Sequence, residues 1–300
     1  MRTNESPLQG RLLLAAALAT LTTFTFVPSG RANLLSAEAT EDELSAAEFS
    51  DDPFYNIRLT SGLDFTTGNY GTSDSTDIWY APFTTKLEAE NHAFKLTVPY
   101  LSITDAGSVV GGGDQVIVVG DGTGGERRTE EGLGDIIGVA SFYVFPGTES
   151  LPIVDLNYKI KFPTADKDRG LGTGEFDHSF EIDFSKAWGE ATVFATAGYK
   201  IFGDPSGYDL DDVFYGSVGA QCSLSELTRV GLIYDIRDNT TPTSHGISEI
   251  TGYLSRDLGE AWKFMLYGVG GLSDGSPDWG VGFTLTRLTD FESLGQLLDF

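Results

Sequence analysis

The sequence has a single cysteine, Cys222, among its 300 residues, so the chain cannot form an internal disulfide. It is also poor in basic residues: 19 Lys and Arg stand against 44 Asp and Glu, which gives a formal net charge of −25. Such an acidic chain repels phosphate, and we therefore expect no nucleic-acid partner. Beyond the first 32 residues, no apolar run is long enough for a helix that spans a membrane.

The one long apolar run lies close to the N-terminus. Residues 12–27 are uncharged and mostly apolar, they follow Arg2 and Arg11, and residues 30–32 offer small side chains to a signal peptidase. The run is shorter than the roughly 20 residues that a spanning helix needs. We interpret residues 1–32 as a secretory signal peptide, with a membrane-anchor helix as the alternative.

Residues 33–53 differ from the rest of the chain because they hold seven acidic side chains and no Lys or Arg. Thr40 and Glu43 have the spacing that caps one short helix. We interpret the segment as an acidic, solvated linker. The alternative is a periplasmic or plug segment that folds into a pore and partly fills it.

From Tyr55 onward, apolar and polar residues alternate with the period of two that is typical of strands with one apolar face. In residues 154–162, one face reads Val, Leu, Tyr, Ile and Phe, and the other reads Asp, Asn, Lys and Lys. The pattern predicts about twelve strands of about ten residues, the length that a tilted membrane strand requires. They are expected at residues 55–66, 77–88, 93–104, 133–145, 153–163, 177–187, 191–202, 212–222, 228–238, 247–257, 262–272 and 278–288.

The predicted connections alternate between short turns and mostly longer, Asp- and Gly-rich loops, as expected for the two rims of an outer-membrane barrel. The polar faces carry glycine, threonine and charges of both signs, which suits a wet lumen. Aromatic residues lie where strands meet connections: Phe65, Phe162, Phe180 and Trp279 near one rim, and Tyr143, Phe145 and Phe184 near the other.

We therefore predict an all-β fold for residues 54–288, a transmembrane antiparallel up-and-down β-barrel of about twelve strands in the cell outer membrane. A soluble β-barrel or sandwich, which buries the apolar face instead of showing it to lipid, is the alternative.

Residues 170–174 (Gly-Leu-Gly-Thr-Gly) look like a loop that cradles a phosphate. In a dinucleotide fingerprint a third glycine would follow Gly172 by three residues, and Glu175 stands there. A strand, not a helix, is predicted next. We therefore interpret the run as an extracellular loop.

The acidic residues of that loop raise the question of a calcium site. Asp166, Asp168 and Asp177 lie close together, but Leu171 stands where an EF-hand requires glycine. A solvated acidic loop is the interpretation, with loose binding of divalent cations as the alternative. We predict no cofactor and no dedicated metal site.

Lipid hydrolysis is the enzymatic alternative, because outer-membrane lipid hydrolases are also β-barrels. Such an enzyme places His and Ser two residues apart on one strand face, so that the imidazole can activate the hydroxyl. His178 and Ser179 are adjacent and point to opposite faces, His245 and Ser248 sit at a loop–strand junction, and His92 is in a turn. We therefore predict no catalytic residues and no enzyme.

Three short motifs resemble one bacterial family. They are Gly132-Leu133-Gly134-Asp135 opening a strand, residues 162–166 (Phe-Pro-Thr-Ala-Asp) closing one, and Gly172-Thr173-Gly174 with Asp177 after it. Over residues 55–288 the chain is similar to the family named for the MetA pathway of phenol degradation, although Ala165 stands where that family usually has Gly. The resemblance implies a passive outer-membrane transporter, and its name points to phenol-like substrates.

Two segments match the terminal pattern that barrel-assembly machinery reads, residues 278–285 and residues 293–300. The first lies in the better alternating strand, so we favour it as the closing strand and interpret residues 289–300 as a periplasmic tail. Assembly machinery, outer-membrane lipids and a small-molecule solute are the expected partners.

The expected function is passive passage of small solutes, with small hydrophobic or aromatic compounds among the candidates. Acidic loops would attract cations to the mouth, which predicts a weak preference for cations. A structural or interaction barrel without an open pore is the first alternative, and a lipid-modifying enzyme is the second. The side chains predicted to line the pore are Arg58, Asp64, Lys95, Asp155, Lys159, Lys161, Glu181, Asp183, Lys200, Arg229, Asp235 and Arg237.

Overall fold

The computed structural model describes residues 56–106, 109–111, 116–118, 126–205, 209–242 and 244–289. The predicted signal peptide, the acidic linker, the segment 293–300 and nearly all of the predicted tail lie outside the described residues. Among the described residues, no helix is long and apolar enough to cross a membrane.

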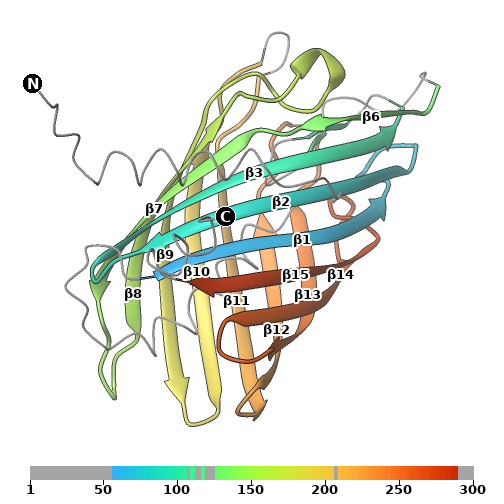
Figure 1. Cartoon of the computed structure of the whole chain (residues 1–300). Coiled ribbons are helices and arrows are strands. Elements are labelled where there is room, and N and C mark those ends of the chain that lie inside the picture. The colour runs from blue at the N-terminus through green and yellow to red at the C-terminus, as the bar shows by residue number, and fades with distance from the viewer. Residues whose placement is uncertain are drawn as a thin grey trace, which may run out of the picture.

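The chain folds into a closed β-barrel (Figure 1). Thirteen strands form one sheet in the order β2-β1-β15-β14-β13-β12-β11-β10-β9-β8-β7-β3-β6, and a further pairing of β2 with β3 closes it. β6 and β7 pair with successive parts of β3, so together they fill one of twelve positions. The strands are β1 (Asn56–Gly68), β2 (Thr76–Glu88), β3 (His92–Asp105), β6 (Arg128–Leu133), β7 (Ile136–Phe145), β8 (Ile153–Phe162), β9 (Asp177–Trp188), β10 (Ala191–Ile201), β11 (Val213–Ser225), β12 (Thr228–Arg237), β13 (Ile247–Asp257), β14 (Trp262–Gly271) and β15 (Trp279–Thr289).

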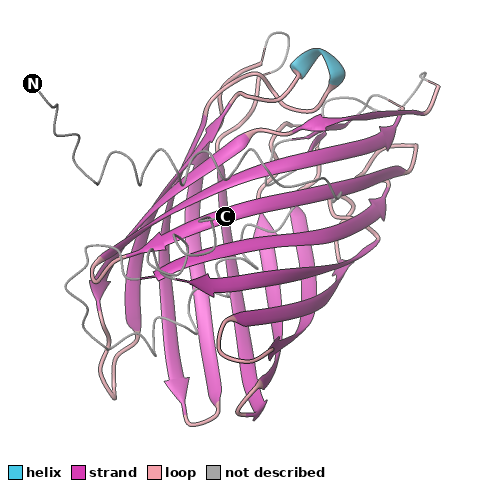
Figure 2. Ribbon diagram, in the orientation of Figure 1, coloured by secondary structure: helices cyan, strands magenta, loops and turns pink. Residues whose placement is uncertain are grey.

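Every pairing in the barrel joins neighbours in antiparallel orientation, and the connections alternate between short turns and longer loops. Among the described residues, the loop rim carries one 3-10 helix, η1 (Lys167–Arg169), drawn in cyan in Figure 2. The short strands β4 (Val109–Gly111) and β5 (Val116–Val118) pair with each other. The prediction of an all-β, twelve-strand antiparallel barrel is confirmed.

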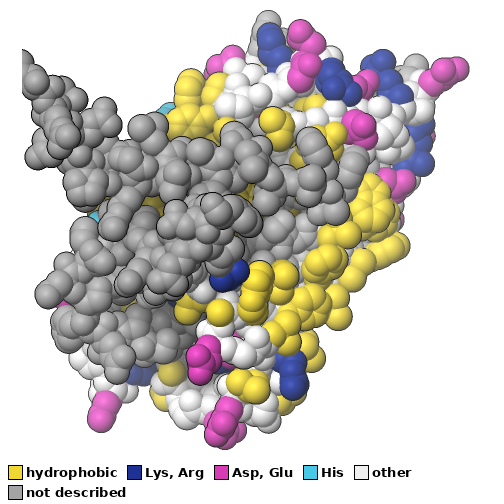
Figure 3. Space-filling model, in the orientation of Figure 1, with side chains coloured by type: hydrophobic (Ala, Val, Ile, Leu, Met, Phe, Trp, Pro, Cys, Tyr) yellow, Lys and Arg dark blue, Asp and Glu magenta, His cyan; other side chains and the backbone are white. Residues whose placement is uncertain are grey.

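The alternating sequence pattern determines which face each side chain takes. In β8, Asp155 and Lys159 are 5% and 6% exposed, whereas Leu156 between them is 43% exposed. The same holds around the barrel, so polar side chains fill the inside and apolar ones cover the outside. In Figure 3, hydrophobic side chains gather on the visible wall and charged ones at its two ends. An apolar wall between charged rims is the surface that a bilayer covers.

Aromatic side chains mark the rims on the outer face. Phe65 packs between Trp79 and Trp279 near the loop rim, with ring centroids 4.8 and 5.5 Å away. Trp188 is 61% exposed near the turn rim. Tyr143 differs from the prediction: it pairs with the buried, inward Asp155, so its ring belongs to the inner face.

The predicted strand 133–145 is interrupted, which is a correction to its bounds. Pro99 of β3 lies opposite the gap between β6 and β7, where its carbonyl accepts a hydrogen bond from Gly134 N at 2.9 Å. The register with β3 changes by one residue across this gap. Because side chains alternate, the change puts both Gly132 and Asp135 on the inner face.

Candidate functional site

The lumen gathers the charged side chains and is the candidate functional site. The structure places all twelve of the charged residues predicted from strand parity on the inner faces of their strands. Eight are buried: Arg58, Asp64, Asp155, Lys159, Lys161, Glu181, Lys200 and Arg237. Four are partly buried: Lys95, Asp183, Arg229 and Asp235.

Near the turn rim, one carboxylate is shared by two cations. Arg58 Nε lies 2.6 Å from Glu88 Oε2, and Lys86 Nζ lies 2.6 Å from Glu88 Oε1. All three side chains are 10% exposed or less. Removing Glu88 would leave two buried cations without this counter-ion, a change that typically destabilises a protein strongly.

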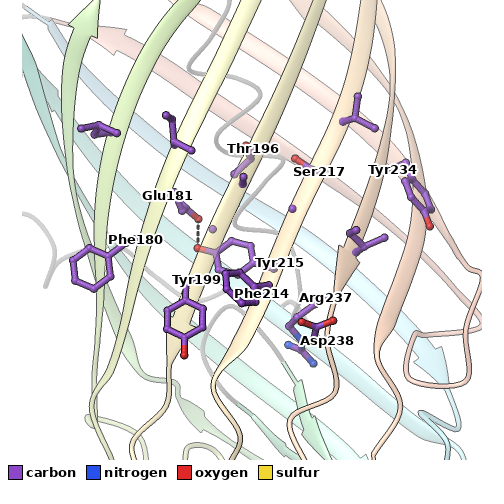
Figure 4. Close-up of a pocket in the computed structure, with 17 residues that line it drawn as sticks. Phe180, Glu181, Thr196, Tyr199, Phe214, Tyr215, Ser217, Tyr234, Arg237 and Asp238 are labelled. Atoms are coloured by element: carbon purple, nitrogen blue, oxygen red, sulfur yellow. Dashed lines mark hydrogen bonds between the residues drawn. The ribbon is translucent and has the colours of Figure 1, made fainter.

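Halfway along the lumen, a second group joins three strands. Lys159 Nζ lies 2.9 Å from Glu181 Oε1, and the Tyr215 hydroxyl donates to the same oxygen at 2.7 Å (Figure 4). Asp183 accepts 2.6 Å hydrogen bonds from one side chain on each neighbouring strand. These bonds fix the carboxylates along the wall.

Near the loop rim, a third group carries two lysines. Lys161 Nζ lies 2.8 Å from Asp135 Oδ2 and 3.4 Å from Asp177 Oδ2, and it donates to Thr173 Oγ1 at 2.7 Å. Lys200 Nζ lies 3.5 Å from the same oxygen of Asp177. Loop 163–176 is thereby tied to the inner wall.

The three motifs that carry the family resemblance meet at this place. Asp135 Oδ1 accepts a hydrogen bond from Ala165 N at 2.9 Å, and Thr164 Oγ1 donates to the carbonyl of Gly134 at 3.1 Å. A Cβ at Gly172 would lie 2.7 Å from Ala165 Cβ and 2.8 Å from both carboxylate oxygens of Asp135. The glycine motif therefore allows a close loop contact, and the interpretation of residues 170–174 as a loop is confirmed.

Five inner side chains form an apolar patch on β10, β12, β13 and β14. Most of the patch lies across the barrel from β1, β2, β3 and β8, which carry charged side chains. The patch consists of Phe194, Ile233, Tyr253, Met265 and Tyr267.

Three lumen tyrosines share one geometry: the ring lies over a glycine of the adjacent strand, and the hydroxyl reaches an acceptor on the strand beyond. The pairs are Tyr215 over Gly198, Tyr253 over Gly231 and Tyr267 over Gly282. The hydroxyls donate to Glu181, Gln221 and Asp64, at 2.7, 2.9 and 2.5 Å. Because a Cβ on any of these glycines would overlap a ring, glycine is what keeps the rings against the wall.

A groove of about 800 Å³ lies along β8–β12, and its lining includes outward residues as well as the inward residues Glu181, Thr196, Tyr215 and Arg237. Phe180, Tyr199, Phe214 and Tyr234 line it on the lipid side, where strand alternation directs them (Figure 4). The pairings of β9 with β10 and of β10 with β11 are continuous here, so the strands do not part between groove and lumen.

The sequence prediction omitted several lumen side chains. Lys86 and Glu88 were within its reach, because Thr84, Lys86 and Glu88 alternate with Thr85 and Leu87 in a predicted strand. The inward position of the apolar patch gave no comparable signal, since Met265 and Tyr267 alternate with residues that are apolar as well.

His178 and Ser179 do not form a catalytic pair. His178 lies on the outer face, where its Nδ1 is 2.7 Å from the Tyr158 hydroxyl, whereas Ser179 is buried on the inner face. Within the part of the chain that the structure describes, no cluster of three or more His, Cys, Asp or Glu could hold a metal ion.

Closed hydrogen bonding, an apolar outer wall and a charged interior define the chain as an outer-membrane β-barrel. No family model matches the chain, and no curated protein matches its sequence.

Solved structures resemble it at low identity. The KdgM porin in complex with disordered oligogalacturonate has a TM-score of 0.45 at 8% identity, over 77% of this chain and 98% of that one. The CymD monoaromatic hydrocarbon channel has 0.43 at 8%, over 79% and 89%. Outer membrane phospholipase A from Escherichia coli has 0.43 at 9%, over 83% and 97%. Likeness at this level assigns neither a family nor an activity.

Proposed function

We propose that the protein is a non-enzymatic channel through which small solutes cross the outer membrane passively along the lumen. The observation that carries the proposal is the inner face, where charged and hydroxyl side chains fill a wall that lipid never reaches. A barrel that served only as an anchor would be stable with an apolar, tightly packed interior. The twelve predicted residues, together with Lys86 and Glu88, are proposed to line the path.

Small hydrophobic or aromatic compounds are the proposed solutes. The apolar patch provides a surface for their bodies, and the charged wall opposite provides polar contacts. The resemblance to the MetA-pathway family agrees with this solute class. Uptake of a neutral aromatic probe into liposomes that contain the protein, compared with a sugar of similar size, tests the preference.

The first experiment is single-channel conductance of the folded protein in a planar bilayer under a KCl gradient. We expect steady openings, with a reversal potential that reports the charge preference. A protein that is shown to be folded and yet stays silent would contradict an open channel. Repeating the measurement after deletion of residues 33–53 would then test whether that segment plugs the pore.

A structural barrel without an open pore is the second candidate, and one observation favours it. Leu171 of the loop between β8 and β9 is 1% exposed and packs with Tyr70 against the inward side chains Ile78, Leu101 and Ile103. These contacts occupy part of the lumen near the loop rim. Folded protein that neither conducts nor admits solutes, with or without residues 33–53, would support this candidate.

A further inference from the structure

Three cations of the lumen face one another in direct register on adjacent strands. Arg58 of β1 is the cross-strand partner of Lys86 of β2, and Lys86 is the partner of Lys95 of β3. Like charges that lie directly opposite each other destabilise a sheet. Glu88 contacts Arg58 and Lys86, but this one carboxylate does not contact the third cation.

Lys95 differs from the other cations of the lumen in its contacts. Within the described part of the chain, it makes no hydrogen bond and no ion pair, whereas Lys159, Lys161 and Lys200 all contact carboxylates. Its cross-strand partner on one side is Lys86, and on the other side Val139 separates it from Lys159. A negative charge next to Lys95 Nζ would therefore relieve repulsion within a row of cations.

The row of cross-strand partners that begins with Arg58, Lys86 and Lys95, here called the basic row, continues beyond Lys95. It passes through Val139, Lys159 and Ser179 to Lys200. Barrel strands are tilted by roughly 35–45°, so a row across them climbs along the axis. Arg58 lies near the turn-rim end of β1 and Lys200 near the loop-rim end of β10, so the basic row runs from one half of the lumen to the other.

The apolar patch lies across the lumen at a matching depth. Lys95 is the fourth residue of β3 and Met265 is the fourth residue of β14, and both strands start at the turn rim. Tyr253 is in the half of β13 that ends at the same rim. In the closed strand order, β13 lies seven places from β3 in one direction and five in the other, and thus nearly opposite.

We propose that this level of the lumen binds small organic anions, with a carboxylate on Lys95 and an apolar body against the patch of Ile233, Tyr253 and Met265. The proposal rests on the channel function and narrows its solute class. It reverses the weak cation preference expected from the acidic loops, because the selective charge lies inside the barrel and not at its mouth. The other cations of the basic row, such as Arg58 and Lys200, would attract the anion at other depths of the lumen.

The test uses benzoate as the probe, with neutral benzyl alcohol and small acetate as controls. Benzoate added to a conducting wild-type channel is expected to reduce the KCl current at concentrations where the two controls do not. Lys95→Gln should raise the half-blocking benzoate concentration about tenfold or more, the loss expected for one charge-assisted hydrogen bond. Lys95→Arg should restore most of the effect.

The matched control is Lys186→Gln, which removes the same charge from the outer side of the barrel, where Lys186 contacts the carbonyls of Thr148 and Leu151. Ile233→Thr should weaken benzoate block and leave any weak effect of acetate unchanged. Equal benzoate block in wild type and Lys95→Gln, or equal block by benzoate and benzyl alcohol, would overturn the proposal.

Binding can be measured without conduction, so the two proposals fail separately. Calorimetric titration of the detergent-folded protein with benzoate should show binding that Lys95→Gln loses and Lys186→Gln keeps. A silent wild-type channel that still binds benzoate in this way would refute the channel and retain the site. A conducting channel with no Lys95-dependent binding would do the reverse.

Discussion

The lumen tyrosines that lie over glycines make the sharpest stability prediction, and Gly231→Ala is the change that tests it. The ring and hydroxyl of Tyr253 occupy the space that a Cβ at Gly231 needs, so the ring must leave the wall. Overpacking of this kind costs about 1–3 kcal/mol. Loss of the 2.9 Å bond from Tyr253 to Gln221 adds roughly 0.5–1.5 kcal/mol.

Alanine also recovers backbone entropy that glycine loses, by roughly 0.5–1 kcal/mol, so the net expectation is a loss of about 0.5–4 kcal/mol. The control is Gly252→Ala, next to Tyr253 in the chain but on the outer face, where an added Cβ meets only Leu232 Cδ1 at 3.9 Å. That variant should be neutral or slightly stabilised. The assay is equilibrium unfolding in urea of the protein folded into lipid vesicles, followed by tryptophan fluorescence.

A double-mutant cycle separates the ring contact from a general effect of alanine. With Tyr253→Ala in place, Gly231→Ala should cost little, which gives a coupling of about 1–3 kcal/mol between the two positions. If Gly231→Ala destabilises wild type and Tyr253→Ala background equally, or no more than Gly252→Ala does, the ring is not held by the glycine and the reasoning fails.

Three further changes test other parts of the structure. Asp135→Ala removes the carboxylate that holds Lys161 and should lower the free energy of unfolding by about 3–5 kcal/mol. Asp135→Asn should lower it less, because it keeps the hydrogen bond from Ala165 N. Urea unfolding of wild type and both variants tests this, and equal loss in the two variants would refute the role of the charge. Leu232→Arg on the outer wall should cost roughly 2–4 kcal/mol in vesicles, and Trp188→Arg at the rim roughly 0–1 kcal/mol; similar costs would mean that the outer wall is not in lipid. Gly172→Val should loosen loop 163–176 without unfolding the barrel, seen as faster proteolysis of that loop, and unchanged proteolysis would contradict the close contact with Asp135.

The sequence was sufficient to predict the barrel because lipid imposes a strict rule on every strand. A residue such as Leu156 must face outward and Asp155 inward, and the period of two records that choice along the chain. Predicted and observed strands therefore agree closely. The break between β6 and β7 was missed because Gly134 and Asp135 continue the alternation in sequence while the register changes in space.

The contacts inside the lumen were beyond the sequence, because they depend on which residues of different strands stand opposite one another. Tyr253 needs Gly231 beside it and Gln221 one strand further, and no local pattern records either distance. The same is true of the link between Lys161 and Asp135, which are 26 residues apart. The alternation along a strand predicts which face a side chain takes, whereas its contacts on neighbouring strands depend on the register between the strands.

Register also connects the lipid to the proposed anion site. A slip of one residue in β2 would turn Lys86 and Glu88 outward and bring Leu87 into the lumen. It would cost roughly 0–1 kcal/mol for a lysine on the outer face near the rim, and it would break the pair of Glu88 with Arg58. The bilayer and the ion pair together fix β2 between β1 and β3, and that fixed pairing sets Arg58, Lys86 and Lys95 in one row. Repulsion within the row is the cost of this alignment, and a bound carboxylate would relieve it. Benzoate should therefore stabilise wild type against urea, and it should stabilise Lys95→Gln less.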